Sequence, residues 1–138
     1  MNYPKSRLRR LRYNKNIRSL VQDVQLNISD LIYPIFICEG ENIKEEIKSL
    51  PGQYRLSVDN VLVLCDELIK LGIKSILLFG ISDKKDNDGS IACSEDSIIP
   101  FAIKKIKKKF NTDILIMADL CNCSYTSHGH CGTIENND

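Results

Sequence analysis

The chain alternates between continuous apolar runs and amphipathic segments, and this alternation predicts its secondary structure. Runs rich in β-branched and aromatic residues predict buried strands at 31–38, 75–79 and 114–120. Between them, apolar residues recur every three or four positions, which predicts helices at 58–71 and 97–110. The order strand, helix, strand, helix, strand indicates an α/β fold with a parallel sheet and right-handed crossovers.

Local signals support most of these boundaries, and one residue conflicts with them. Ser57 stands at an N-cap position and Gly72 at a helix C-terminus. Pro34 is unexpected within a buried strand, because proline cannot donate to a ladder and prefers an edge or a strand end. Residues 39–50 are predicted to be a charged connection and residues 82–90 an exposed loop.

Length and composition indicate one globular domain. The chain has 138 residues, of which 43% are hydrophobic and 27% charged, so a collagenous or wholly disordered protein is excluded. No apolar run approaches the length of a membrane helix, and no apolar core with a cleavage site follows the basic N-terminus. We therefore expect a soluble, cytoplasmic protein that does not bind a membrane.

The formal net charge of +1 conceals a basic N-terminal segment. Residues 1–30 carry seven basic residues against two acidic ones, so the remainder of the chain is acidic. A basic arm of this kind either binds nucleic acid by neutralising phosphates or pairs with acidic groups on a neighbouring subunit. No groove-reading or RNA-binding motif accompanies it.

The six cysteines fall into two groups. Cys38 and Cys65 lie in apolar runs and are predicted to be small buried hydrophobes, while Cys93 lies in a polar loop and its role is open. The absence of a signal peptide argues against a secreted disulfide framework. The other three lie within eleven residues, with two histidines between them: Cys121, Cys123 and Cys131.

This cysteine cluster predicts a metal site. Two thiols at i and i+2 of extended backbone point to the same side, and Gly129 lets the chain bend so that a third thiol returns. Three thiolates would hold Zn²⁺ and leave its fourth position open. His128 or His130 could instead close a Cys₃His site, and a C-x-C redox pair is a further alternative. The cluster follows the third strand, where active sites of parallel sheets gather.

The motif D-x-C-x-C-x-x-T-S-H-G-H-C-G at residues 119–132 closely resembles the zinc-binding motif of the porphobilinogen synthase (δ-aminolevulinate dehydratase) family. Five upstream segments resemble further parts of that family, in the same order. They are R-L-R-R-L-R (7–12), D-L-I-Y-P-I-F-I (30–37), L-P-G-Q-Y-R-L-S (50–57), L-G-I-K-S-I-L-L-F-G (71–80) and G-S-I-A (89–92).

The resemblance implies an enzyme of tetrapyrrole (haem) biosynthesis that condenses two molecules of 5-aminolevulinate to porphobilinogen. It implies the N-terminal portion of a (β/α)₈ TIM barrel, with residues 30–138 forming the first three βα units. Residues 1–29 would be an extended arm that embraces a neighbouring subunit, commonly in an octamer. This gives the basic segment a better explanation than nucleic acid, which we no longer expect as a partner.

Carried over by position, Cys121, Cys123 and Cys131 would be the three ligands of a catalytic zinc. Asp119 matches an acidic residue that lines the family's active site, with a role in proton handling or ammonium recognition, although a strand-end aspartate is as often a turn residue. His128 and His130 would shape the loop, or lie around the ligands without binding the metal themselves. Some relatives also have an allosteric magnesium site.

The family's two Schiff-base lysines lie downstream of the zinc motif. None of the thirteen lysines here matches either one, so this chain alone is expected to be inactive. Two hypotheses follow. The chain is the N-terminal part of an active synthase, or it is a non-catalytic remnant that acts at most as a zinc-binding fragment.

Overall fold

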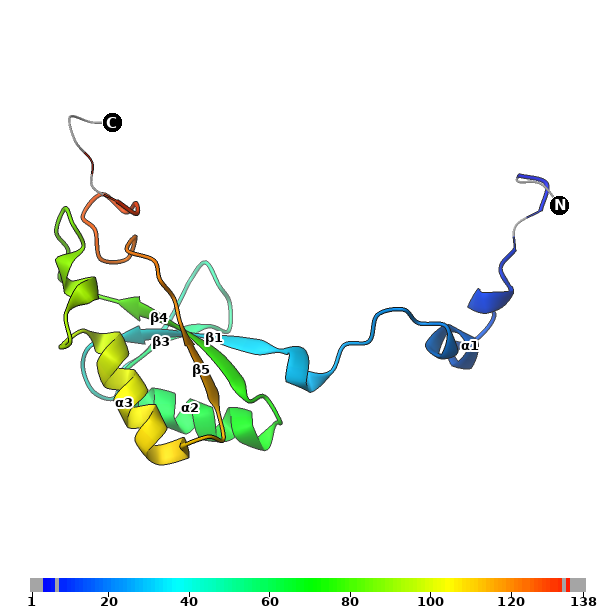
Figure 1. Ribbon diagram of the computed structural model, residues 1–138, viewed down its shortest axis with the longest axis horizontal. Coiled ribbons are helices and arrows are strands. Elements are labelled where there is room, and N and C mark those ends of the chain that lie inside the picture. The colour runs from blue at the N-terminus through cyan, green and yellow to red at the C-terminus, as the bar shows by residue number, and fades with distance from the viewer. Residues whose placement is uncertain (1–3, 7, 133, 135–138) are drawn as a thin grey trace.

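The computed structural model of the protein describes residues 4–6, 8–132 and 134. A five-stranded sheet and two long helices form its body, and Figure 1 shows their arrangement. The strand order is β2-β3-β1-β4-β5. The neighbouring strands β1 (Ile32–Cys38), β4 (Ser75–Ile81) and β5 (Leu115–Ala118) run parallel to one another. Helices α2 (Val58–Lys70) and α3 (Ile98–Phe110) connect them in turn. The predicted α/β order is thus confirmed.

Both helices pack against one face of the sheet, and the hydrophobic core lies between the helices and that face. Alternate residues of the central strands point into this core, among them Ile35, Ile37, Ile76 and Leu78, each at most 2% exposed. Their partners come from the apolar stripes of the two helices, which include Val61, Cys65, Ala102 and Ile106. Two-residue periodicity in the strands and helical periodicity in α2 and α3 therefore meet in one layer of side chains.

The connection after β1 contains a hairpin that the sequence did not predict. Strands β2 (Lys44–Glu46) and β3 (Tyr54–Leu56) pair antiparallel. Strand β3 then runs parallel to the end of β1, beside Phe36 and Ile37. All three residues of β2 are exposed, so the segment has none of the apolar alternation that signals a strand. The expectation of a plain charged connection at 39–50 was therefore wrong.

Pro34 lies in the middle of β1 and pairs with Leu77 of β4. Strand β3 reaches β1 only at Phe36 and Ile37, so within the described residues Pro34 has a neighbouring strand on one flank alone. The missing N–H is tolerated because this part of β1 is locally an edge.

The described residues before β1 (4–6 and 8–31) extend away from the body (Figure 1), and the helices among them are short. These are η1 (Arg10–Arg12), α1 (Lys15–Leu20) and η2 (Ile28–Asp30). The Asn14 side chain caps α1 by accepting a hydrogen bond from the Ile17 N–H, at 2.9 Å. Arg7, part of the arginine-rich motif, lies outside the described residues. Apolar side chains in this segment are largely exposed, at 77–85% for Leu8, Leu20, Val24 and Leu26.

Two further expectations can be compared with the structure. Cys65 is fully buried as predicted, but Cys38 is only half-buried because it ends β1 on the face away from the helices. Strand β4 extends two residues past Phe79, whereas β5 is shorter than predicted. None of the described helices has the length and apolar character needed to cross a membrane.

Candidate metal centre

Two loops leave the carboxyl ends of neighbouring parallel strands and meet at one edge of the sheet. The β4 loop comprises residues 82–93 and ends in the short helix η3 (Ser90–Cys93). The cysteine loop comprises residues 119–132 and follows β5. Its first residue still belongs to the ladder, because the Asp119 N–H donates to the Leu78 carbonyl at 3.0 Å. The start of the cysteine loop is therefore fixed by the sheet.

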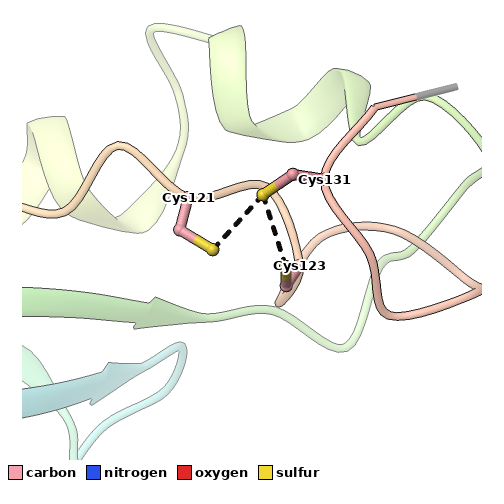
Figure 2. Close-up of side chains that lie close together, drawn as sticks. All are labelled: Cys121, Cys123 and Cys131. Atoms are coloured by element: carbon pink, nitrogen blue, oxygen red, sulfur yellow. Dashed lines mark hydrogen bonds between the residues drawn. The ribbon is translucent and has the colours of Figure 1, made fainter.

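The three cysteines of this loop converge on one point (Figure 2). The Sγ atom of Cys131 lies 3.5 Å from that of Cys121 and 3.3 Å from that of Cys123. All three sulfur atoms lie within 4.8 Å of one another. These distances exceed the bond of about 2.05 Å in a disulfide, and the three thiols are free. They approach the roughly 3.8 Å that separates thiolates bound to one tetrahedral ion. The cluster can hold a metal.

Hydrogen bonds within the cluster favour a negative charge on one sulfur. The Cys123 and Cys131 sulfurs share a hydrogen bond at 3.3 Å, and Cys131 also accepts from the Asn122 N–H at 3.3 Å; these bonds lower the pKa of Cys131. The same sulfur–sulfur bond raises the pKa of Cys123 to about 11. A bound cation would replace the thiol proton that the two sulfurs now share.

Neither histidine joins the sulfur cluster. The ring of His128 uses both nitrogens elsewhere: Nδ1 accepts from the His130 N–H at 3.2 Å, and Nε2 lies 3.0 Å from the Asn87 carbonyl oxygen. The ring of His130 stacks beside that of His128, with the ring centroids 6.2 Å apart. Among the described residues, the three cysteines form the one group of potential ligands close enough to share an ion. The Cys₃His alternative gains no support.

The two loops are joined by backbone and side-chain hydrogen bonds. The Asp86 N–H donates to the Tyr125 carbonyl at 3.3 Å, and the Ser127 N–H donates to the Asp86 carbonyl at 2.8 Å. The Ser127 hydroxyl also donates to Asn87 Oδ1 at 2.9 Å. The Asp86 carboxylate accepts from the hydroxyl and the N–H of Ser90, which lowers the pKa of Asp86 and keeps the β4 loop folded as a support.

Tyr125 anchors the cysteine loop to the sheet, a role that the sequence reasoning missed. Its side chain is 6% exposed and lies over Gly80 of β4, where an added Cβ would overlap the phenol hydroxyl. Burial raises the pKa of Tyr125, and the Asp119 carboxylate raises it further. The signals in the sequence were one aromatic residue in a polar loop and a glycine in an otherwise apolar strand.

Asp119 itself is exposed at the end of β5, two residues before Cys121. The negative charge of its carboxylate contributes to the raised pKa of Tyr125. A role in handling protons or binding an ammonium group is still a prediction.

A largely parallel sheet with a three-thiol cluster at its carboxyl edge defines a class: α/β proteins whose candidate metal site is built on strand-end loops. A family model described as delta-aminolevulinic acid dehydratase matches residues 5–138. The chain belongs to the delta-aminolevulinic acid dehydratase family.

Individual relatives agree with this assignment. The chain is 50% identical over 131 residues to the delta-aminolevulinic acid dehydratase of Helicobacter pylori, covering 94% of this chain and 40% of that one. It is 46% identical over 136 residues to the protein of the same name from Methanothermus sociabilis, and this match covers 99% of this chain and 42% of that one. The chain thus spans about two fifths of the length of these relatives.

A solved structure gives the same result for the fold. The delta-aminolevulinic acid dehydratase of Toxoplasma gondii, crystallised with its reaction product porphobilinogen, superimposes with a TM-score of 0.88 at 36% identity. The match covers 96% of this chain and 38% of that one. The prediction of the N-terminal portion of a (β/α)₈ barrel is confirmed.

Proposed function

We propose that this chain is the N-terminal part of a zinc-dependent porphobilinogen synthase, a hydro-lyase that condenses two molecules of 5-aminolevulinate to porphobilinogen and water. The observation that carries the proposal is the three-thiol cluster at the carboxyl edge of the sheet, within a chain that belongs to this family. Residues 30–138 would then supply the first βα units of the barrel and residues 1–29 its arm.

Zinc is the metal that fits the donor set best. Three soft thiolates favour Zn²⁺ over hard cations such as Mg²⁺ or Ca²⁺, which take oxygen ligands. Three protein ligands leave the fourth tetrahedral position for substrate or water, as in catalytic zinc sites. Bound there, zinc would supply Lewis acidity toward a substrate oxygen or nitrogen.

The chain's own groups would hold and orient the reactants. Cys121, Cys123 and Cys131 would hold the ion at the carboxyl edge of the sheet, where substrates of (β/α)₈ barrels bind. Asp119, an exposed carboxylate beside the ligands, would accept a proton or bind the substrate ammonium group. No lysine here is assigned a Schiff base, so chemistry requires residues beyond those in this chain.

The arm supports assembly into an oligomer. It is basic and carries exposed apolar side chains, a surface that a second subunit would cover. We propose a cytoplasmic homo-oligomer, an octamer as the resemblance implies, in which the arm contacts a neighbour. A magnesium site would belong to the full-length enzyme.

Metal binding tests the first step of this proposal. Equilibrium dialysis with zinc should give one ion per purified chain, and Cys121→Ser or Cys123→Ser should weaken binding at least tenfold. Cys93→Ser is the matched control, because Cys93 is an exposed free thiol outside the cluster. Equal binding by all four proteins would refute the site.

Activity is tested with a fusion in which this chain replaces the matching two fifths of the Helicobacter pylori relative. With zinc and 5-aminolevulinate, the fusion should form porphobilinogen, its Cys123→Ser variant should not, and the chain alone should not. A fusion that binds zinc but forms no porphobilinogen, beside an active intact relative, would favour the non-catalytic remnant. Turnover by the chain alone would refute the need for the downstream lysines.

A further inference from the structure

The third thiol of the cluster needs more support than the other two. Cys121 and Cys123 directly follow β5, and their backbone continues from a residue that the sheet still holds at Asp119. Cys131 comes eight residues after Cys123, in an exposed part of the loop without regular secondary structure. Its position must therefore be set by contacts that the loop makes with itself and with its surroundings.

Those contacts concentrate on the residue just before Cys131. The backbone N–H of His130 donates to Nδ1 of His128 at 3.2 Å. The backbone carbonyl of His130 accepts from the hydroxyl of Thr126 at 2.9 Å. Both polar groups of the His130 backbone are thus held by side chains of the same loop, and that carbonyl belongs to the peptide bond that leads into Cys131.

Each of the two holding side chains is itself fixed. Thr126 is 1% exposed, and its backbone N–H donates to the Asn122 carbonyl at 3.0 Å. His128 places Nε2 3.0 Å from the carbonyl oxygen of Asn87, on the β4 loop. Since Nδ1 acts as an acceptor, the neutral ring carries its proton on Nε2 and donates it to that carbonyl. The chain of contacts runs from the β4 loop through His128 to the residue before Cys131.

We propose that His128 and Thr126 are positioning residues for the metal site: they hold the His130 backbone from both sides and so keep Cys131 within metal-binding distance of Cys121 and Cys123. This inference rests on the proposed zinc site and assigns to His128 a role other than ligation. Its ring is occupied on both nitrogens, so it acts on the metal only through the position of Cys131.

The test compares variants of the full chain by zinc affinity, in competition with a chromophoric chelator, and by the spectrum of the Co²⁺-substituted protein. The intensity of the sulfur-to-cobalt charge-transfer band reports how many thiolates bind. His128→Ala and Thr126→Val should each lower zinc affinity roughly tenfold or more. They should also reduce the charge-transfer band from three thiolates toward two.

Conservative variants separate positioning from general loop stability. His128→Asn keeps an acceptor that can reach the N–H two residues on, as in an Asx-turn, and Thr126→Ser keeps the hydroxyl, so both should restore most of the affinity. Ser127→Ala is the matched control. It removes the hydrogen bond to the Asn87 side chain without touching the His130 backbone, and it should keep a three-thiolate spectrum.

The outcomes distinguish this inference from the proposed function. If the unaltered chain binds zinc through three thiolates and His128→Ala and Thr126→Val do the same with equal affinity, the inference is refuted and the zinc site stands. If Ser127→Ala loses as much affinity as His128→Ala, general anchoring of the loop explains the effect, and the specific role is refuted. If the unaltered chain binds no zinc, both the site and the positioning role fail.

Discussion

Replacing Gly80 with alanine should loosen the cysteine loop while changing no ligand. Gly80 lies in β4 under the ring of Tyr125, and a Cβ built there would overlap the phenol hydroxyl. It would also lie 2.9 Å from Ile99 Cγ1 and 3.1 Å from Tyr125 Cζ. Two side chains must therefore move, one from the helix layer and one from the cysteine loop.

The size of the effect follows from what has to move. Overpacking a filled interior costs about 1–3 kcal/mol. Driving the Tyr125 ring out of its site would sacrifice the burial of an aromatic side chain, worth roughly 1.5–3 kcal/mol. We expect Gly80→Ala to lower the free energy of unfolding by about 2 kcal/mol and zinc affinity by roughly tenfold, because the loop that carries Cys123 starts to move with Tyr125.

Because the chain has no tryptophan whose fluorescence could report unfolding, urea unfolding is followed by circular dichroism. Zinc affinity is measured by competition with a chelator. Tyr125→Phe removes the overlapping hydroxyl, so the double variant Gly80→Ala/Tyr125→Phe should regain part of both losses relative to Gly80→Ala. Unchanged unfolding and zinc binding in Gly80→Ala would show that Tyr125 does not anchor the loop. A double variant no better than Gly80→Ala would show that the hydroxyl is not the source of the conflict.

Three further predictions concern other parts of the molecule. Burial raises the pKa of Cys65 from an ordinary 9.0 to about 11, so the folded chain holds this proton more tightly than the unfolded chain. The resulting stabilisation is complete below pH 9 and is lost as pH rises toward 11. The free energy of unfolding, measured with urea across this range, should therefore fall less steeply with pH in Cys65→Ala than in the unaltered chain. Gly89→Ala places a side chain on a left-handed backbone (φ 65°), with its Cβ 3.3 Å from Thr126 Cγ2, and should lower the free energy of unfolding by about 1 kcal/mol. Zinc binding, measured by dialysis, should weaken several-fold, and unchanged binding would contradict the supporting role of the β4 loop. Asp119→Asn in the Helicobacter pylori fusion should retain zinc and lose roughly a hundredfold in kcat; an unaltered kcat would make Asp119 a turn residue only.

The body of the fold was predictable from sequence because its signals are local and strong. Each central strand is a continuous apolar run and each long helix has one apolar stripe, so burial on a single face follows from periodicity. Ser57 was placed correctly at the start of α2, but its hydroxyl accepts from the Ile43 N–H at 2.8 Å instead of capping the helix. That contact joins residues fourteen apart, a separation that local patterns do not encode.

The same distinction applies to the clustered cysteines and the residues that support their loop. The spacing of the three cysteines and the bend at Gly129 were enough to predict that Cys121, Cys123 and Cys131 lie together, and the structure places them so. The pairing of Tyr125 with Gly80 depends on which strand lies beside which loop, and no single segment reveals it. The hairpin was missed for the opposite reason: its strands are three residues long and are stabilised by pairing with each other and with β1 rather than by their own composition.

All three thiols and the side chains that position them lie between residues 80 and 131, in a chain that spans only the first part of its relatives' length. A ribosome makes a protein from its N-terminus, so these residues leave the exit tunnel before the strands that close the barrel in longer family members. If the cluster binds zinc as proposed, the nascent polypeptide would capture the ion, and the bound ion would stiffen the strand-end loops while the sheet still has an open edge. Metal loading would then precede folding of the complete barrel.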